Sequence, residues 1–142
     1  RGEARVGFDY DSGSGRYTAP VDSRQWFYGL LDMRDPAIAA AERVIERGLR
    51  ACVPSGELVY EHRPFLNGWE FDPHRVGGPG QPCWPGDAIA YREFQFLTTA
   101  DARLGTFAHY AEQNLVVFGT DLVEQVAEEL EELLGGGAWS FG

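Results

Sequence analysis

The sequence predicts an α+β domain in which a mostly antiparallel sheet carries two helices packed on one face. Two observations support this class. The expected elements follow the order strand, helix, several strands, helix, and the last two strands are separated by a turn short enough for a hairpin. A length of 142 residues is usual for one domain, so residues 1–142 are expected to form a single domain.

The first half of the chain begins with strand patterns and continues into a helix. Residues 5–10 are expected to form an edge strand, and the aromatic-rich residues 24–31 a second strand. Asp35 is a typical N-cap and is followed by Pro36, so a helix is predicted from Asp35 to Cys52. Its buried stripe is expected to hold Ile38, Ala41, Ile45, Leu49 and Cys52.

Two strands and a long loop are expected next. Residues 58–63 and 65–71 are predicted strands separated near Pro64, and Asn67-Gly68 offers an alternative turn that would shift their register. Residues 73–87 are dense in proline and glycine, which is typical of an irregular loop that covers a pocket or crosses a sheet edge.

The remaining segments predict three strands and a helix. Residues 88–98 alternate like a strand, and residues 104–109 and 113–118 are expected to form a hairpin. The last helix is expected to begin at Asp121, with Glu124 completing a capping box, and to stop at Gly135. Its buried stripe would contain Leu122, Val126, Leu130 and Leu133, and its outer face is rich in glutamate.

The charge balance excludes several classes of partner. The chain has 12 arginines, no lysine and 22 acidic residues, a formal net charge of −10. Such a surface repels nucleic acid and anionic membranes, and the absence of lysine excludes Schiff-base catalysis. Arginines 43, 47 and 50 alternate with Glu42 and Glu46, a pattern that predicts a solvent-exposed, ion-paired helix face.

The two cysteines predict a reducing compartment. Cys52 and Cys83 are too few for a disulfide framework, so we expect a cytoplasmic protein, although a bridge between them stays open. No apolar stretch is long enough to span a bilayer. The histidines and cysteines have no spacing typical of metal ligands, and no nucleotide-binding motif is present, so no metal or cofactor is expected.

One block of residues resembles a known family signature. Residues 105–112 and the Val-Phe-Gly at 117–119 are similar to a bacterial family of domains of unknown function, number 2716, in which the signature reads Gly-x-Phe-Gly-His-Pro-Trp-Glu and then Val-Phe-Gly. The matching residues are Gly105, Phe107, His109, Glu112, Val117, Phe118 and Gly119. The resemblance implies a compact scaffold and no particular activity.

The sequence departs from that family in the segments expected to carry a site. Ala108, Tyr110 and Ala111 replace the expected Gly, Pro and Trp, and residues 63–66 read Arg-Pro-Phe-Leu where the family has Asp-Trp-Gln-His. Both a divergent natural relative and an engineered pocket fit these departures.

His109 and Glu112 form one candidate catalytic pair. If Tyr110-Ala111 were a two-residue turn, the two side chains would be cross-strand partners on one face, suited to acid and base chemistry. Along a continuous strand they would face opposite sides, and a hydrogen-bonded structural histidine is the competing interpretation.

The leading functional hypothesis is a small-molecule-binding domain with an aromatic and polar pocket on a curved sheet. Its ligand is expected to be a small hydrophobic or aromatic molecule. The site would draw on Tyr60, His62, Trp69, Tyr91, Phe94 and Phe107, together with His109 and Glu112. The alternatives are an acid/base enzyme that uses His109 with Glu112, and an acidic domain that binds a protein partner, such as an inhibitor of a basic toxin.

Overall fold

The computed structural model describes residues 9–11, 16–18, 22–29, 31–32, 34–63, 66–85, 88–89, 94–110, 113–134 and 139–140. Its main element is a seven-stranded sheet with the strand order β5-β4-β6-β7-β8-β3-β9. The strands are β3 (Ser23–Phe27), β4 (Val59–Arg63), β5 (Leu66–Phe71), β6 (Phe94–Thr99), β7 (Gly105–His109), β8 (Asn114–Phe118) and β9 (Trp139–Ser140). A separate two-stranded sheet joins β1 (Asp9–Asp11) and β2 (Arg16–Thr18).

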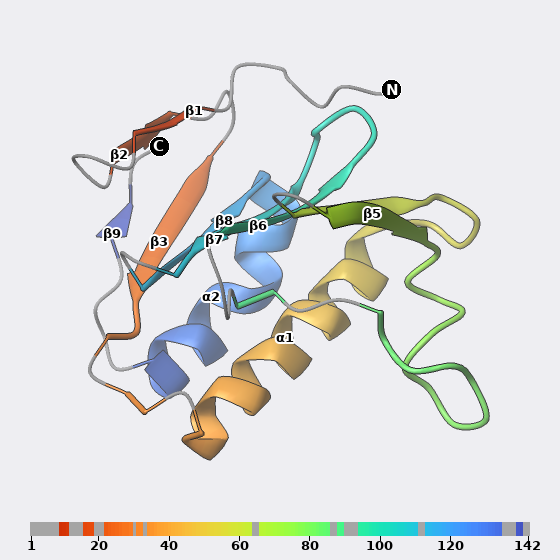
Figure 1. Ribbon diagram of the computed structural model, residues 1–142, viewed down its shortest axis with the longest axis horizontal. Coiled ribbons are helices and arrows are strands. Elements are labelled where there is room, and N and C mark those ends of the chain that lie inside the picture. Colours follow the sequence, from red (N-terminus) through yellow and green to blue (C-terminus); the bar gives the residue numbers. More distant parts are fainter. Residues whose placement is uncertain are drawn as a thin grey trace.

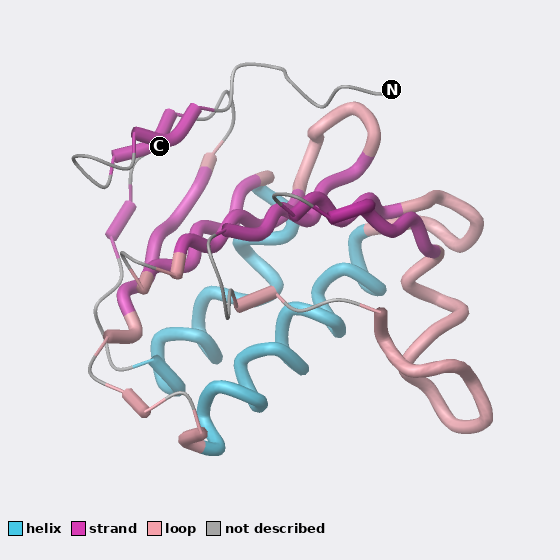
Figure 2. The backbone as a smooth tube through the Cα atoms, viewed as in Figure 1, coloured by secondary structure: helices cyan, strands magenta, loops and turns pink. Residues whose placement is uncertain are grey.

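Both helices lie on one face of an antiparallel sheet, which confirms the predicted α+β class. Every strand pair of the seven-stranded sheet is antiparallel. Helices α1 (Pro36–Cys52) and α2 (Thr120–Leu134) run beside each other below the sheet in Figure 1, and the tube in Figure 2 shows the same two layers. This arrangement buries one sheet face and the facing stripe of each helix.

Helix α1 has the ends that its sequence predicts. The Asp35 side chain accepts a 2.9 Å hydrogen bond from the backbone N–H of Ala37, and Pro36 occupies the first helical position. At the other end the N–H of Val53 still bonds to the carbonyl of Leu49. The predicted helix over residues 35–52 is therefore confirmed.

Helix α2 begins one residue earlier than predicted. It starts at Thr120, so Asp121 lies within its first turn and is not the N-cap. Its buried residues are Leu122, Val126, Leu130 and Leu134, with Leu133 only partly buried. The stripe thus follows the expected helical spacing and ends one residue later than predicted.

Close packing of the two helices depends on Gly48. A β-carbon at this position would lie 2.6 Å from Cγ1 of Val126 and 2.9 Å from Cδ1 of Leu122. Such distances are well inside van der Waals contact. The missing side chain therefore lets α1 approach α2 more closely than a larger residue would.

The main core lies between the sheet and the helices. Trp26, Leu97 and Leu115 contribute buried side chains from three strands, and Ile45 and Leu130 contribute from the helices. Each of these side chains is fully buried, which removes a large apolar area from water and stabilises the two-layer arrangement.

Several sequence-based boundaries were wrong. Asn67 and Gly68 lie inside β5, so they do not form the alternative turn. Strand β6 begins at Phe94, whereas Ala88 and Ile89 are buried outside any strand because they pack into the core beside α1. Strand β3 ends at Phe27, before the predicted end at residue 31.

Candidate functional site

Five of the predicted site residues share the sheet face opposite the helices. Pairing places His62 beside Phe96 and Phe96 beside Phe107, in one row across β4, β6 and β7. Tyr60 lies two residues from His62 on β4, and the next row pairs Phe94 with His109. Because directly paired residues point to the same side of a sheet, these side chains lie on a common face.

Aromatic side chains on this face contact one another from β4 across to β8. The Phe96 ring packs edge-on against His62, with centroids 6.4 Å apart, and against Phe107 at 5.5 Å. Phe94 contacts Phe107 at 6.0 Å, and Phe118 extends the cluster at 6.1 Å from Phe96. We call these residues, His62, Phe94, Phe96, Phe107 and Phe118, the aromatic face.

The two histidines of the expected pocket do not meet. His62 and His109 lie on the same face but are two strands and two residues apart, which corresponds to about 12 Å between their Cα atoms. Phe96 and Phe107 lie between them, and His62 is exposed. One small chemical group therefore cannot contact both imidazoles.

Trp69 does not join the aromatic face. Trp69 pairs with Glu61 and therefore shares the helix side of the sheet, at the edge strand, where it is 54% exposed. Tyr91 lies outside the described residues.

The predicted pairing of His109 with Glu112 is wrong. His109 is the cross-strand partner of Asn114, so four residues, 110–113, connect β7 to β8. The N–H of Gln113 bonds to the carbonyl of Tyr110 within this turn. Tyr-Ala is poor chemistry for a two-residue hairpin, which favours the longer turn. Glu112 itself lies outside the described residues.

The centre of this sheet face is packed and not open. Phe107 is 5% exposed, Val116 is fully buried and Gln25 is 1% exposed, although all three face away from the helices. At its margins Phe94 and Phe27 are 37% and 38% exposed. The aromatic face therefore behaves as a second, smaller core with partly exposed edges.

A cavity of about 390 Å³ lies between α1 and the loop of residues 72–85. This loop was expected either to cover a pocket or to cross a sheet edge, and the sequence did not indicate that it would face α1. The walls are Glu42, Arg43 and Glu46 of α1, and Gly77, Gly78, Gln81, Pro82, Cys83 and Trp84 of the loop. We call this site the α1–loop cavity.

Arg50 fastens the middle of the loop to α1. Its Nε donates a 3.0 Å hydrogen bond to the carbonyl of Pro73, and Nη2 donates a 2.7 Å bond to the carbonyl of Val76. The guanidinium carbon also lies 5.4 Å from the centre of the Trp84 ring. Trp84 packs in turn on Phe71, with ring centroids 4.9 Å apart.

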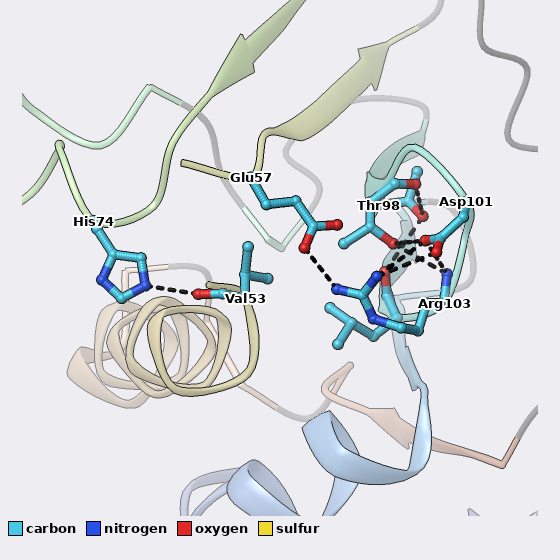
Figure 3. A network of polar contacts seen from close by, with 8 residues as sticks. Val53, Glu57, His74, Thr98, Asp101 and Arg103 are labelled. Atoms are coloured by element: carbon cyan, nitrogen blue, oxygen red, sulfur yellow. Dashed lines mark hydrogen bonds and ion pairs between the residues drawn. The ribbon is translucent and has the colours of Figure 1, made fainter. Parts of the chain in front are cut away.

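Polar contacts also hold the start of the loop. The Asp72 carboxylate accepts 2.9 Å and 2.8 Å hydrogen bonds from the N–H groups of His74 and Gly56. These bonds, that of His74 first, keep the Asp72 pKa below its ordinary value. Nε2 of His74 lies 2.7 Å from the Val53 carbonyl at the end of α1, as Figure 3 shows.

The same view shows the ionic contacts at the neighbouring end of the sheet. Arg103 donates a 2.9 Å bond to Glu57 and a 3.2 Å bond to Asp101. The contact with Glu57 joins the turn after β6 to the segment just before β4. The end of the sheet nearest the loop is therefore tied together by charged groups.

Glu42 and Glu46 are the cavity residues that sequence analysis misplaced. The prediction of a solvent-exposed helix face is wrong for them, because each is only 9% exposed. Glu42 accepts a 3.2 Å bond from the N–H of Ile89, and Glu46 accepts a 3.0 Å bond from Arg43. The sequence held one signal of this burial. Glu42 directly follows Ala41, and Glu46 directly follows Ile45, and both of these preceding residues belong to the predicted buried stripe.

The exposed side of α2 is acidic, as predicted. Glu124, Glu128, Glu129, Glu131 and Glu132 are all exposed. Two of them are paired within the protein, Glu129 with Arg47 and Glu131 with Arg24, at 3.2 Å each.

The two cysteines are free thiols in different environments. Cys83 is exposed and lines the cavity, whereas Cys52 is partly buried at the end of α1. Burial raises the Cys52 pKa, and Asp121 raises it further, against an opposing effect of Arg103. Among the described residues, no three His, Cys, Asp or Glu side chains are grouped to hold a metal ion.

The sequence matches a family over most of its length. Residues 5–123 match the family described as protein of unknown function (DUF2716). The chain belongs to this family. Neither a search of curated proteins nor a search of solved structures found a match. Membership in DUF2716 thus identifies the scaffold without supplying an activity.

Five of the residues that resemble the family signature lie at the centre of the sheet. Gly105, Phe107 and His109 belong to β7, and Val117 and Phe118 belong to β8. A β-carbon on Gly105 would collide with the carbonyl oxygen of Leu97 on the adjacent strand. Gly105 therefore allows close strand pairing, and the α1–loop cavity lies away from β7 and β8. No helix in the described part of this chain has the length and apolar character needed to cross a membrane.

Proposed function

We propose that this protein is a small-molecule-binding domain and that its ligand occupies the α1–loop cavity. One observation carries the proposal: a cavity of about 390 Å³ has two nearly buried carboxylates, Glu42 and Glu46, in its wall. Ligand sites are usually clefts of roughly 300–1,000 Å³ with a few oriented polar groups. The α1–loop cavity has the size of such a site, and its wall includes the Trp84 ring beside the two carboxylates.

The bracing of the loop supports the proposal. Arg50 holds two loop carbonyls, and Gln81 bonds across the loop to the carbonyl of His74 at 3.1 Å and to the N–H of Gly78 at 3.1 Å. The N–H of Gly77 also bonds to the Pro82 carbonyl at 2.7 Å. A wall that is ordered before binding loses little conformational entropy when the ligand arrives.

This placement moves the site away from the sheet face that the sequence suggested. A ligand needs accessible surface, and the centre of that sheet face is buried at Phe107 and Val116. The acid and base alternative loses its geometric basis because His109 pairs with Asn114. Small-molecule binding therefore remains the preferred function, at a different site.

A fragment screen tests the proposal directly. ¹⁵N-labelled protein is titrated with a library of polar and aromatic fragments while backbone amide signals are recorded. Binding in the α1–loop cavity should shift the signals of Gly77, Gly78, Gln81 and Cys83 together. A library that moves none of these amides, or moves only amides of β7 and β8, argues against the proposal.

Alkylation of Cys83 provides the matched control. Cys83 is exposed at the cavity wall, so reaction with N-benzylmaleimide should block the site and abolish the fragment-induced shifts. Ala100→Cys in a Cys83→Ser background moves the reactive thiol to the exposed turn after β6, where the same label should leave binding unchanged. Equal inhibition by both labels would show that the effect is not local.

A further inference from the structure

We propose that β5 binds an extended, arginine-containing segment of another protein, which adds a strand to the sheet. The proposal does not depend on the α1–loop cavity, because β5 forms an edge of the sheet and contributes no residue to the cavity wall. It is carried by the exposed backbone of this edge and by two exposed side chains, Trp69 and Glu70, that lie on its opposite faces.

β5 is the sheet edge at which a further strand can pair. It has six residues and, within the described part of the chain, pairs with β4 alone. The strand at the other edge, β9, has two residues, and Figure 1 shows β5 and β9 at opposite ends of the sheet. An edge strand presents backbone N–H and C=O groups to which an extended peptide can bond.

The backbone of β5 is accessible to such a peptide. Gly68, Trp69 and Glu70 are three consecutive exposed residues. Since glycine has no side chain, the exposed surface of Gly68 is backbone surface. A β-carbon at this position would collide with the carbonyl oxygen of Glu61 on β4, so a larger residue requires the two strands to shift. The middle of β5 therefore offers main chain to a partner.

Trp69 and Glu70 give the two faces of this edge different chemistry. Trp69 pairs with Glu61 and lies on the helix side, where it is 54% exposed. Glu70 pairs with Tyr60 and lies on the other side, where it is also exposed. The side chains of an added strand alternate in the same way, so one set of them meets Trp69 and the other set meets Glu70.

This arrangement favours an arginine in the partner strand. A residue opposite Gly68 lies on the same side as Glu70, above a position that has no side chain of its own. A long side chain has room there, and a guanidinium can pair with the Glu70 carboxylate in a fork. The residues on either side of this arginine point to the helix side, where apolar side chains can pack on the exposed ring of Trp69.

The charge of the chain favours a different protein over a second copy of this one. Its formal net charge is −10, so two β5 edges brought together would join two acidic surfaces. Like charges across a strand pair are destabilising, whereas a basic segment is attracted to an acidic surface. The partner is therefore a basic, extended segment.

Two peptides of matched length test the proposal. One is acetyl-Thr-Val-Arg-Val-Thr-amide, and the other has glutamate in place of arginine. Titrated into the ¹⁵N-labelled full chain, the arginine peptide should shift the amide signals of Gly68, Trp69 and Glu70. The glutamate peptide should bind about tenfold more weakly. If millimolar arginine peptide leaves these three amides unmoved, the proposal is overturned.

N-methylation tests whether the peptide pairs as a strand. Successive residues of a strand direct their N–H groups to opposite sides, so every second one faces β5. Peptides methylated on alternate residues should therefore form two sets, one that loses binding and one that keeps it. The same effect in both sets would mean that the peptide does not add a strand.

Variants of the protein identify the contacts. Trp69→Ala should weaken binding of the arginine peptide about tenfold, because it removes an exposed aromatic anchor. Glu70→Lys should reverse the preference, so that the glutamate peptide binds more tightly. Glu124→Lys makes the same charge change on the exposed side of α2 and should preserve the preference for arginine. All three positions are exposed, and thermal melting verifies that each variant is folded.

Sedimentation equilibrium tests the competing occupant, a second copy of the chain. A monomer that binds the arginine peptide supports the proposal. A dimer that Trp69→Ala dissociates would place a second copy on β5 and overturn it. The proposed function stands apart from these outcomes, because it is read at the amides of Gly77 and Gly78, which the peptides should not shift.

Discussion

The guanidinium of Arg50 lies over the indole ring of Trp84, with 5.4 Å between the guanidinium carbon and the ring centre. The two residues are 34 positions apart in the chain, and their contact joins α1 to the loop that forms the other wall of the cavity. The same guanidinium also bonds to the carbonyls of Pro73 and Val76. Arg50 thus contributes three of the contacts that hold the loop against the helix.

Replacing Arg50 by alanine should destabilise the protein by about 2–4 kcal/mol, because two charge-assisted hydrogen bonds and the ring contact are lost. Arg47→Ala removes an exposed ion pair with Glu129 and should cost about 1 kcal/mol or less. Urea unfolding of both variants measures the difference. Equal midpoints for the two would mean that Arg50 does not fasten the loop.

Gly48→Ala should destabilise the protein by about 1–3 kcal/mol, because the added methyl group collides with Val126 and Leu122. In a Val126→Ala background the cost should fall, since the obstructing Cγ1 is gone. A double-mutant cycle by denaturant unfolding measures this coupling. If packing were loose, Gly48→Ala would instead stabilise the helix by about 1 kcal/mol.

Asp72 should make the protein sensitive to acid. Its pKa is lowered from the ordinary value of 3.8 by the hydrogen bonds from His74 and Gly56, so its contribution to stability is present above pH 3.8. That contribution is lost as the pH falls from this value through the lower pKa of the folded state. Asp72→Asn should be less stable than wild type at pH 6.

The stability difference between wild type and Asp72→Asn should narrow as the pH falls below 4. Urea midpoints measured from pH 7 to pH 2.5 follow it. Asp121→Asn, on the exposed first turn of α2, serves as a carboxylate control. If the difference in urea midpoint between wild type and Asp72→Asn stays constant across this pH range, the assigned role of the Asp72 carboxylate is contradicted.

The two thiols should react with dithionitrobenzoate at different rates. Cys83 is exposed and should react first, whereas Cys52 is partly buried and its pKa is raised from 9.0, so less of it is thiolate at pH 8. The native protein should therefore show two phases, and Cys83→Ser should remove the fast one. A single phase accounting for both thiols would contradict the structure.

Local patterns were sufficient to predict most of the secondary structure. Asp35 and Pro36 specify the start of α1, and the strands over residues 58–63 and 65–71 closely match β4 and β5. These features depend on capping, backbone geometry and alternation over a few residues. They can be evaluated without knowing what lies elsewhere in the chain.

The predicted turn at Tyr110-Ala111 failed because loop length is poorly marked in sequence. Alternation placed strands on both sides, but it did not determine which residues pair across them. The structure pairs His109 with Asn114, two residues further along the chain than the expected partner. Register depends on the hydrogen bonds of the whole sheet and is decided only when the neighbouring strands are in place.

By itself, the sequence determined the α+β class, the two amphipathic helices and the irregular character of the loop that follows β5. Only the tertiary structure decided that this loop folds onto α1 and buries Glu42 and Glu46. Helical spacing indicates on which face of the helix a side chain lies. It does not indicate which distant segment packs on that face, because the burial of a charged side chain depends on contacts between segments that are far apart in the sequence.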